Sequence, residues 1–233
     1  CKTENEIQQH LKPNLLAEAF TTGTEMSIET FRSNHKTLLI NPTQYLKPGW
    51  ANILPADLPS ELLEEIKSLT EKVHRALDIQ TGISHMEIFL TKNGPIFGEI
   101  AARPPGGYIM ELLKTAYKFN PWKTLIKLAT NQPTKLPTTH KQHAGVYLIH
   151  PNPGTIQTIK GLTKATNLPH IKKITCNLKP GDQIQTRQGT GQTKGKILAT
   201  APTHNQTKTA LTTAHQTLKI TTLPISNGDQ QQS

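Results

Sequence analysis

Residues 82–111 read Gly-Ile-Ser-His-Met-Glu-Ile-Phe-Leu-Thr-Lys-Asn-Gly-Pro-Ile-Phe-Gly-Glu-Ile-Ala-Ala-Arg-Pro-Pro-Gly-Gly-Tyr-Ile-Met-Glu. Two runs of β-favouring residues flank an Asn-Gly-Pro break, and Glu87 and Glu99 lie near the middle of one run each. The second run leads through Arg103 into a Pro-Pro-Gly-Gly loop. We expect a β-hairpin that carries a functional site. The alternative is that both glutamates are ordinary solvent-facing strand residues.

The number of residues in the turn decides whether Glu87 and Glu99 share a face of the sheet. A two-residue turn at Asn93-Gly94 would pair Glu87 with Ile100 and put the two acids on opposite faces. A three-residue loop ending at Pro95 would make the acids diagonal neighbours, close enough for a divalent cation to lie between them. We predict the longer loop because proline has no N–H for a ladder. It also gathers one apolar face from Met86, Ile88, Leu90, Ile96 and Ile100.

A second group of residues predicts an anion site next to the acids. Gly106 and Gly107 open a helical pattern, and Arg103 lies just before them. Free backbone N–H groups at a helix start bind anions, and an arginine reinforces this. Carboxylates beside an anion site suggest phosphate chemistry.

These motifs resemble those of the ATP-grasp superfamily of carboxylate-amine ligases, and most closely its L-amino acid ligase branch. The resemblance is carried by His85-x-Glu87 and by Glu99-Ile-Ala-Ala-Arg103-Pro-Pro-Gly106-Gly107. It departs from the family at Ala101, where an asparagine often serves as a further metal ligand.

The resemblance implies a role for each of these residues. The metal ligands for Mg²⁺ or Mn²⁺ would be Glu87 and Glu99, and Arg103 would act in catalysis by stabilising an acylphosphate. The residues that contact substrate would be Gly106, Gly107 and His85.

The segment near the amino terminus adds a nucleotide motif. Residues 15–20 are predicted to form a strand, with residues 24–31 as its antiparallel partner. Glu18 and Glu25 have the spacing at which the family contacts ATP. The resemblance implies that Glu25 accepts bonds from the ribose hydroxyls, and that Glu18, Ala19 and Phe20 border the adenine.

Composition favours a folded intracellular protein. A chain of 233 residues can bury one large core or two small ones, and two cysteines fit a reducing cytoplasm. No segment resembles a signal peptide, and no apolar run approaches the about 20 residues of a membrane span. We therefore expect a cytoplasmic protein that does not enter a membrane.

The net charge of +10 is unevenly distributed, with −4 on residues 1–111 and +14 on residues 112–233. A basic half can indicate nucleic-acid binding. However, no aromatic residue follows Tyr147, so this half lacks a stacking platform for single strands. Nucleic acid is therefore an unlikely partner, and a lysine-solvated surface is expected.

The remaining pattern predicts an α+β fold. An antiparallel sheet flanked by helices, the carboxy-terminal subdomain of an ATP-grasp domain, is expected at residues 1–133, followed by a linker at 134–140. A small β-rich module is expected at 141–226, and a disordered tail at 227–233. Residues 41–59 are predicted to be a long loop, in which Tyr45 or Trp50 would either border the substrate or plug the loop onto the core. A helix is predicted at residues 60–77, another is predicted to start at Asn120-Pro121, and Thr203 is predicted to cap a last helix.

The resemblance covers nearly all of this sequence but only about the carboxy-terminal half of a complete ligase. It implies ATP, a small carboxylic acid and an amine as ligands. The other half would be in the same protein or in a second chain, and similar ligases are often homodimers. The alternative is a non-catalytic remnant that binds nucleotide or acts as an interaction module.

Overall fold

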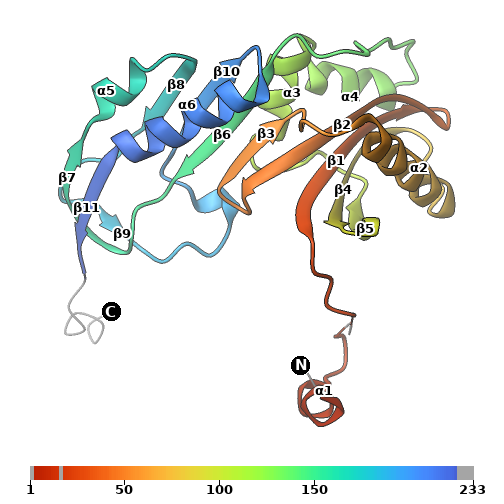
Figure 1. Ribbon diagram of the computed structural model, residues 1–233, viewed down its shortest axis with the longest axis horizontal. Coiled ribbons are helices and arrows are strands. Elements are labelled where there is room, and N and C mark those ends of the chain that lie inside the picture. Colours follow the sequence, from red (N-terminus) through yellow and green to blue (C-terminus); the bar gives the residue numbers. More distant parts are fainter. Residues whose placement is uncertain (1–2, 16–17, 225–233) are drawn as a thin grey trace.

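The computed structural model describes residues 3–15 and 18–224, and its main feature is a mixed fold with one large antiparallel sheet (Figure 1). The strand order of that sheet is β5-β4-β1-β2-β3-β6-β10-β8. The strands are β1 (Thr24–Ser33), β2 (Lys36–Lys47), β3 (Ala51–Leu54), β4 (Gly82–Thr91), β5 (Gly94–Ala101), β6 (His143–Ile149), β8 (Ile171–Cys176) and β10 (Gly195–Ala201). The predicted α+β class, with a mainly antiparallel sheet flanked by helices, is confirmed.

Side-chain alternation along β1 assigns each face of the sheet its own partner. Met26 and Ile28 point to one face and pack with Ile66 of α2 (Ser60–Ala76). Phe31 points to the other face and packs with α3 (Ile109–Tyr117) and α4 (Pro121–Ala129). The odd-numbered residues of β1 ahead of Phe31 lie on the same face as α3 and α4, and several of them are polar.

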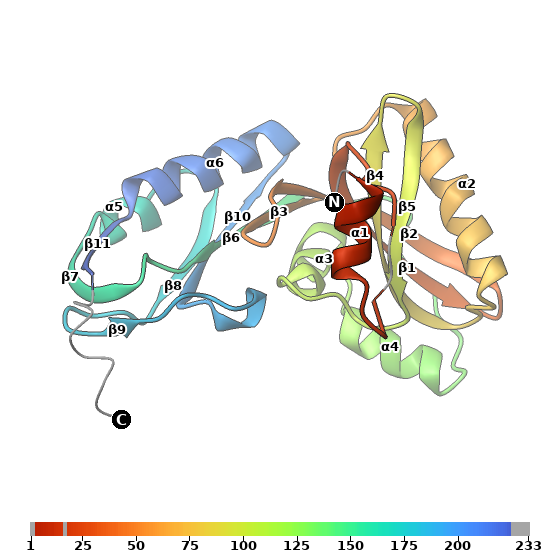
Figure 2. The same cartoon turned by 90° about the horizontal axis from the view of Figure 1, so that it is seen from below.

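The carboxy-terminal part of the chain extends the same sheet. β3 pairs with β6, so the sheet continues from the first part of the chain into the second (Figure 2). The helix α6 (His204–Thr217) packs on β6 and β10, beside α5 (Leu162–Thr166). A separate small sheet has the order β11 (Lys219–Leu223), β7 (Gly154–Lys160), β9 (Gln183–Ile184), and a short 3-10 helix, η1, spans Thr190–Gln192. The predicted domain boundaries stay a prediction.

Several local predictions are confirmed. Thr203 caps α6 in a capping box with Gln206, and Asn120 caps α4, which begins with Pro121. The helix predicted at residues 60–77 is α2. Residues 227–233 lie outside the described part, so the predicted tail is untested.

Two predictions about backbone structure are wrong. Residues 41–59 are not a long loop, because β2 continues to Lys47 and β3 follows. Pro42 is tolerated inside β2 because β3 pairs with β2 only from Gln44 onward, so no second strand needs the missing N–H there. The strand predicted at residues 15–20 is absent at Leu15 and at residues 18–20, and residues 16–17 lie outside the described part. β1 pairs with β2 and β4 instead.

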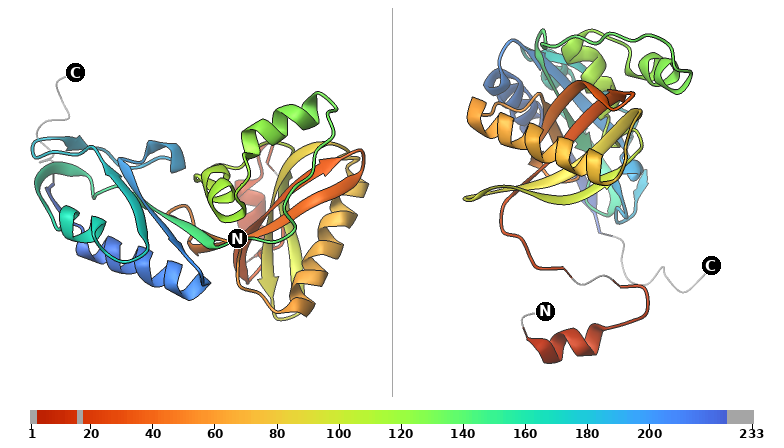
Figure 3. Two further views of the ribbon diagram at one scale, coloured as in Figure 1. Left: turned by 90° about the horizontal axis from the view of Figure 1, so that it is seen from above. Right: turned by 90° about the vertical axis from the view of Figure 1, so that its right-hand side faces the viewer.

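The first helix, α1 (Glu4–His10), has no buried residue. It lies apart from the sheet (Figures 1 and 3). Its helical form therefore depends on local features, such as the Thr3 side chain that accepts a bond from the Glu6 N–H.

Gly145 is required where α6 meets the sheet. A Cβ added at Gly145 would lie 2.7 Å from Leu211 Cδ1 of α6 and 2.9 Å from the Asn52 carbonyl oxygen of β3. The backbone atom cannot move away without disturbing the ladder between β3 and β6. Gly145 is thus a packing residue at the junction of the two parts of the sheet.

Gly145→Ala is expected to lower the free energy of unfolding by roughly 1–3 kcal/mol, the usual cost of overpacking. Urea denaturation followed by circular dichroism measures this. Gly189→Ala is the matched control, because a Cβ there meets nothing within 4 Å. Equal stability of both variants would contradict this expectation, because it would show that α6 moves away from the added Cβ at no cost in stability.

Three histidine rings meet where the chain enters β6. His143 lies 4.7 Å from His140 and 5.7 Å from His204 between ring centroids. Burial, together with the neighbouring histidines, lowers the pKa of His140 and of His143, and burial lowers the pKa of His204. Asp57 opposes the last two shifts without reversing them. The cluster therefore favours neutral rings in the folded state.

Acid is expected to destabilise the protein through this cluster. The unfolded rings titrate at about 6.5 and the folded rings titrate lower, so unfolding takes up protons and the folded state loses stability as the pH falls through 6.5. His143→Phe removes the central ring, and its stability should fall less than that of the wild type between about pH 7.5 and 5.5. The control His10→Gln, on exposed α1, should follow the wild type. Parallel pH curves for all three proteins would contradict the expectation.

Candidate functional site

The hairpin of β4 and β5 brings Glu87 and Glu99 directly opposite each other. The turn is not the predicted three-residue loop: Thr91 pairs with Gly94, so only two residues form it. The prediction that the acids share a face is correct, but the predicted turn is wrong.

A β-bulge at Gly98 corrects the register. Ile88 pairs with Phe97 and Glu87 pairs with Glu99, so Gly98 is the extra residue. Without the bulge, the short turn would have put Glu99 on the opposite face. A Cβ at Gly98 would lie 3.0 Å from the Glu87 carbonyl oxygen, which explains why glycine suits the bulge. The two-residue turn also leaves Ile96 opposite Phe89 and 44% exposed, so its predicted place on the apolar face is wrong.

Two clefts adjoin at Glu87. The first, here called the acidic cleft, has a volume of about 390 Å³ and is lined by Glu18, Ala19, Phe20, Thr21, Glu87, Phe89, Phe97, Gly98 and Glu99. The second, the arginine cleft, has about 330 Å³ and is lined by Tyr45, Gly49, Asn52, His85, Glu87, Arg103, Gly106, Gly107, Ile109 and Leu148. Nine of the ten predicted site residues line one of these clefts, and Glu87 lines both.

The tenth residue, Glu25, lies in β1 opposite Phe89. Burial, and then the charges of Glu87 and Glu99, raise the pKa of Glu25. The three carboxylates therefore concentrate negative charge at the acidic cleft, which suits a cation. Within the described residues, however, no group of three or more His, Cys, Asp or Glu side chains is arranged to hold a metal ion. The Glu87–Glu99 pair fits a divalent cation whose other ligands come from nucleotide or water oxygens.

The loop at the arginine cleft offers donors to an anion. Arg103 is exposed, and its Nη1 donates to the Pro104 carbonyl oxygen at 3.0 Å. The helix start predicted at Gly106 lies further on, at Ile109. Gly107 and Tyr108 both have positive φ, 58° and 62°. Among the described residues no protein acceptor takes the N–H groups of Gly106 or Gly107, so they are free to bind a ligand.

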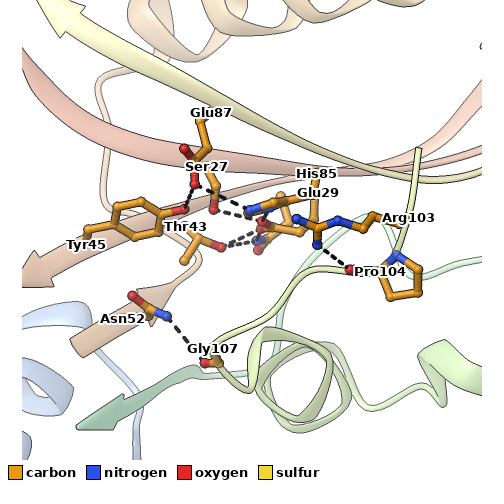
Figure 4. A network of polar contacts seen from close by, with 11 residues as sticks. Ser27, Glu29, Thr43, Tyr45, Asn52, His85, Glu87, Arg103, Pro104 and Gly107 are labelled. Atoms are coloured by element: carbon orange, nitrogen blue, oxygen red, sulfur yellow. Dashed lines mark hydrogen bonds and ion pairs between the residues drawn. The ribbon is translucent and has the colours of Figure 1, made fainter. Parts of the chain in front are cut away.

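A polar network lies behind Glu87 (Figure 4). His85 Nδ1 is 3.0 Å from Glu29 Oε1, and His85 Nε2 is 3.6 Å from Glu87 Oε1. Tyr45 Oη donates to the same Glu87 Oε1 at 3.1 Å. Glu29 is fully buried and also accepts bonds from Ser27, Asn41 and Thr43.

The network fixes the charge states of its members. Burial opposes protonation of His85, but Glu29 and Glu87 outweigh it and raise its pKa to about 9. The contact with His85, against the effect of burial and with help from Tyr45 and Arg103, lowers the pKa of Glu87. Burial, followed by nearby carboxylates, raises the pKa of Tyr45 above its ordinary value. Tyr45 thus remains a donor and Glu87 an acceptor at neutral pH.

Comparison with protein families fits this geometry. An ATP-grasp domain model matches residues 2–111, which contain the hairpin and the acidic cleft. A model for L-amino acid ligase C-terminal domain 2 matches residues 146–222. Residues 2–111 therefore match the ATP-grasp family.

The proteins similar to this chain include ligases for amino acids. The chain is 23% identical to an L-arginine-specific L-amino acid ligase of Bacillus subtilis, over 87% of this chain and 51% of that protein. It is 32% identical over 87 residues to a D-alanine–D-alanine ligase of Mycolicibacterium gilvum, covering 37% of this chain and 23% of that protein. The fold matches the crystal structure of an L-amino acid ligase from Bacillus licheniformis with a TM-score of 0.72 and 21% identity, over 88% of this chain and 53% of that one. The chain spans about half the length of the two L-amino acid ligases.

Glu29 and Tyr45 are the site residues that sequence reasoning missed or left undecided. Tyr45 was expected either to border the substrate or to plug a loop onto the core, and it lines the arginine cleft. Glu29 shares a face of β1 with Glu25 and Ser27. Polar side chains at every second position of a strand whose other residues are buried could have indicated that this face belongs to a site.

Proposed function

We propose that this chain forms half of the active site of a ligase that joins the carboxyl group of an amino acid to an amine and converts ATP to ADP and phosphate in the overall reaction. The observation that supports this most strongly is that Glu87 lines both clefts. ATP in the acidic cleft and substrate in the arginine cleft would then meet at one carboxylate. Mg²⁺ or Mn²⁺ held by Glu87 and Glu99 would neutralise charge on the nucleotide phosphates.

The residues of this chain would contact ATP on one side of Glu87 and the substrate on the other. The backbone at Ala19 and Phe20 would border the purine beside Glu18, and Glu25 would accept bonds from the ribose hydroxyls. Phe20 is 94% exposed, so an aromatic face is available for the base.

In the arginine cleft, the chain's own groups would bind the acyl group. Arg103 and the N–H groups of Gly106 and Gly107 would hold the negative oxygens of an acylphosphate, and His85 would border the substrate. The substrate carboxylate would take the γ-phosphoryl group of ATP, and ADP would leave. Attack by the amine nitrogen would then form the C–N bond, the bond between the carbonyl carbon and the bridging phosphate oxygen would break, and phosphate would leave while the nitrogen gives up a proton to the phosphate or to water. Arg103 would stabilise the oxyanion formed in between.

Trapping of the acylphosphate tests the proposal. The chain, alone and together with any polypeptide encoded directly upstream of Cys1, is incubated with ATP, Mg²⁺, one amino acid at a time and hydroxylamine. We expect ADP and an amino-acyl hydroxamate in equal amounts, formed only with certain acids.

A non-catalytic module is the second candidate, and Ala101 favours it, because it pairs with His85 beside the acids and offers no metal ligand. Nucleotide binding without acid-dependent ADP release, in every combination, would support that candidate and exclude the ligase.

A further inference from the structure

Burial of the Glu29 carboxylate is less favourable for stability than burial of an apolar side chain would be. Its side chain is fully buried in β1, and no lysine or arginine of the described segments lies within 4.0 Å of its carboxylate. Taking a carboxylate out of water costs several kcal/mol, and apolar residues of similar size often fill such a space with no loss of stability. The position therefore serves a purpose other than core packing.

All acceptor positions of Glu29 are engaged. Oε1 accepts from Ser27 Oγ at 2.8 Å and faces His85 Nδ1 at 3.0 Å. Oε2 accepts from Asn41 Nδ2 at 2.9 Å and from Thr43 Oγ1 at 2.5 Å. These donors come from β1, β2 and β4, so the carboxylate is fixed by three strands at once. A carboxylate held this firmly can fix the orientation of the ring beside it.

The His85 ring transmits that orientation to Glu87. His85 pairs with Glu29 across the β1–β4 ladder, and its other nitrogen faces Glu87 Oε1 at 3.6 Å. Tyr45 donates to the same oxygen from β2. Both contacts fall on Oε1, and in the described part of the chain no protein donor lies within hydrogen-bonding distance of Oε2 (Figure 4).

We propose that Glu29, acting through His85, and Tyr45, acting directly, are positioning residues that hold Oε1 of Glu87 and so present Oε2 alone to a divalent cation. This inference rests on the proposed function, because it takes Glu87 as a cation ligand. It assigns roles to two residues outside the set that binds nucleotide, cation and substrate. It also predicts that the cation contacts Glu87 through a single oxygen.

Mn²⁺ affinity of the 233-residue chain, measured by electron paramagnetic resonance in the presence of ADP, tests the inference. Groups that orient a metal ligand typically change affinity by about 10–100-fold. We expect Glu29→Gln and Tyr45→Phe each to weaken Mn²⁺ binding within that range, while the folded state persists in thermal unfolding. Tyr45→Phe removes only a hydroxyl, so it remains informative if Glu29→Gln does not fold.

Ser84→Ala is the matched control. Ser84 is buried in β4 next to His85 and also bonds a histidine, His74 Nε2 at 2.7 Å, but it has no contact with Glu87. Its loss should lower stability without changing Mn²⁺ affinity. A fall in affinity for Ser84→Ala equal to that for Glu29→Gln would show that binding only follows stability, which overturns the inference.

Two further outcomes separate this inference from the proposed function. If Glu87→Gln loses Mn²⁺ binding but Glu29→Gln and Tyr45→Phe retain wild-type affinity, the positioning role is wrong and the proposed function stands. If Glu87→Gln binds Mn²⁺ as well as the wild type, Glu87 is not a cation ligand, and both the proposed function and the inference fail.

Discussion

Replacing Glu87 with glutamine is expected to reduce ATP-dependent amide formation at least about 100-fold, more than the loss of a residue that only supports a metal ligand. Glutamine keeps the size of the side chain and can still meet Tyr45, but it removes the charge that a divalent cation prefers. It also removes the negative partner of His85. The measurement is ADP release that depends on the amino acid, in the assembly that forms hydroxamate.

Glu64→Gln provides the control for charge removal. Glu64 lies on the exposed surface of α2, where it pairs with Lys67 at 2.7 Å. Its replacement should leave the rate unchanged, since exposed pairs contribute about 0–1 kcal/mol to stability and Glu64 lines neither cleft. If both variants lose activity equally, the effect reflects net charge and not a site at Glu87.

Replacing Phe31 with alanine is expected to lower the free energy of unfolding by about 3–5 kcal/mol. The side chain is completely buried between the sheet and the helices α3 and α4, and it meets Phe119 edge-on at 5.6 Å between ring centroids. Because β1 is paired with both β2 and β4 at Phe31 while α3 and α4 cover the ring, the space cannot close by moving a single element. A chain of this size should melt about 10 °C lower, at roughly 2–4 °C per kcal/mol.

Ile126→Ala is the matched control in the same helical layer. Ile126 on α4 is 65% exposed, so its truncation should change stability by no more than about 0.5 kcal/mol. Calorimetry of the two variants against the wild type gives both numbers. A loss below about 1 kcal/mol for Phe31→Ala would mean that the core refills the space, contrary to the close packing seen at Phe31.

The sequence predicted elements whose signals are local. The two helix starts depend only on neighbouring residues, and both are confirmed: Thr203 with Gln206 at α6, and Asn120 with Pro121 at α4. β3 was not predicted, because its four residues become a strand by pairing with β2 and β6, and this pairing leaves no local sequence pattern.

The candidate site was predictable where its residues follow one another along the chain. The motif from Glu99 to Gly107 pointed to Glu99 in the acidic cleft and to Arg103, Gly106 and Gly107 in the arginine cleft. The turn was not predictable, because a bulge at Gly98 compensates for its length and a bulge depends on contacts with the facing strand. Glu29 was missed and Tyr45 was left undecided for a similar reason, since their meeting with His85 and Glu87 depends on the register of three strands.

The shared wall between the two clefts has a thermodynamic consequence. A ligand that moves or neutralises Glu87 from one side changes the affinity measured from the other side, and linkage requires the factor to be the same in both directions. Nucleotide titrations at rising amino acid concentration, and the reverse titrations, should therefore return one coupling constant. In a protein built this way, cooperativity between the two ligands needs no domain movement, because both ligands act on one side chain.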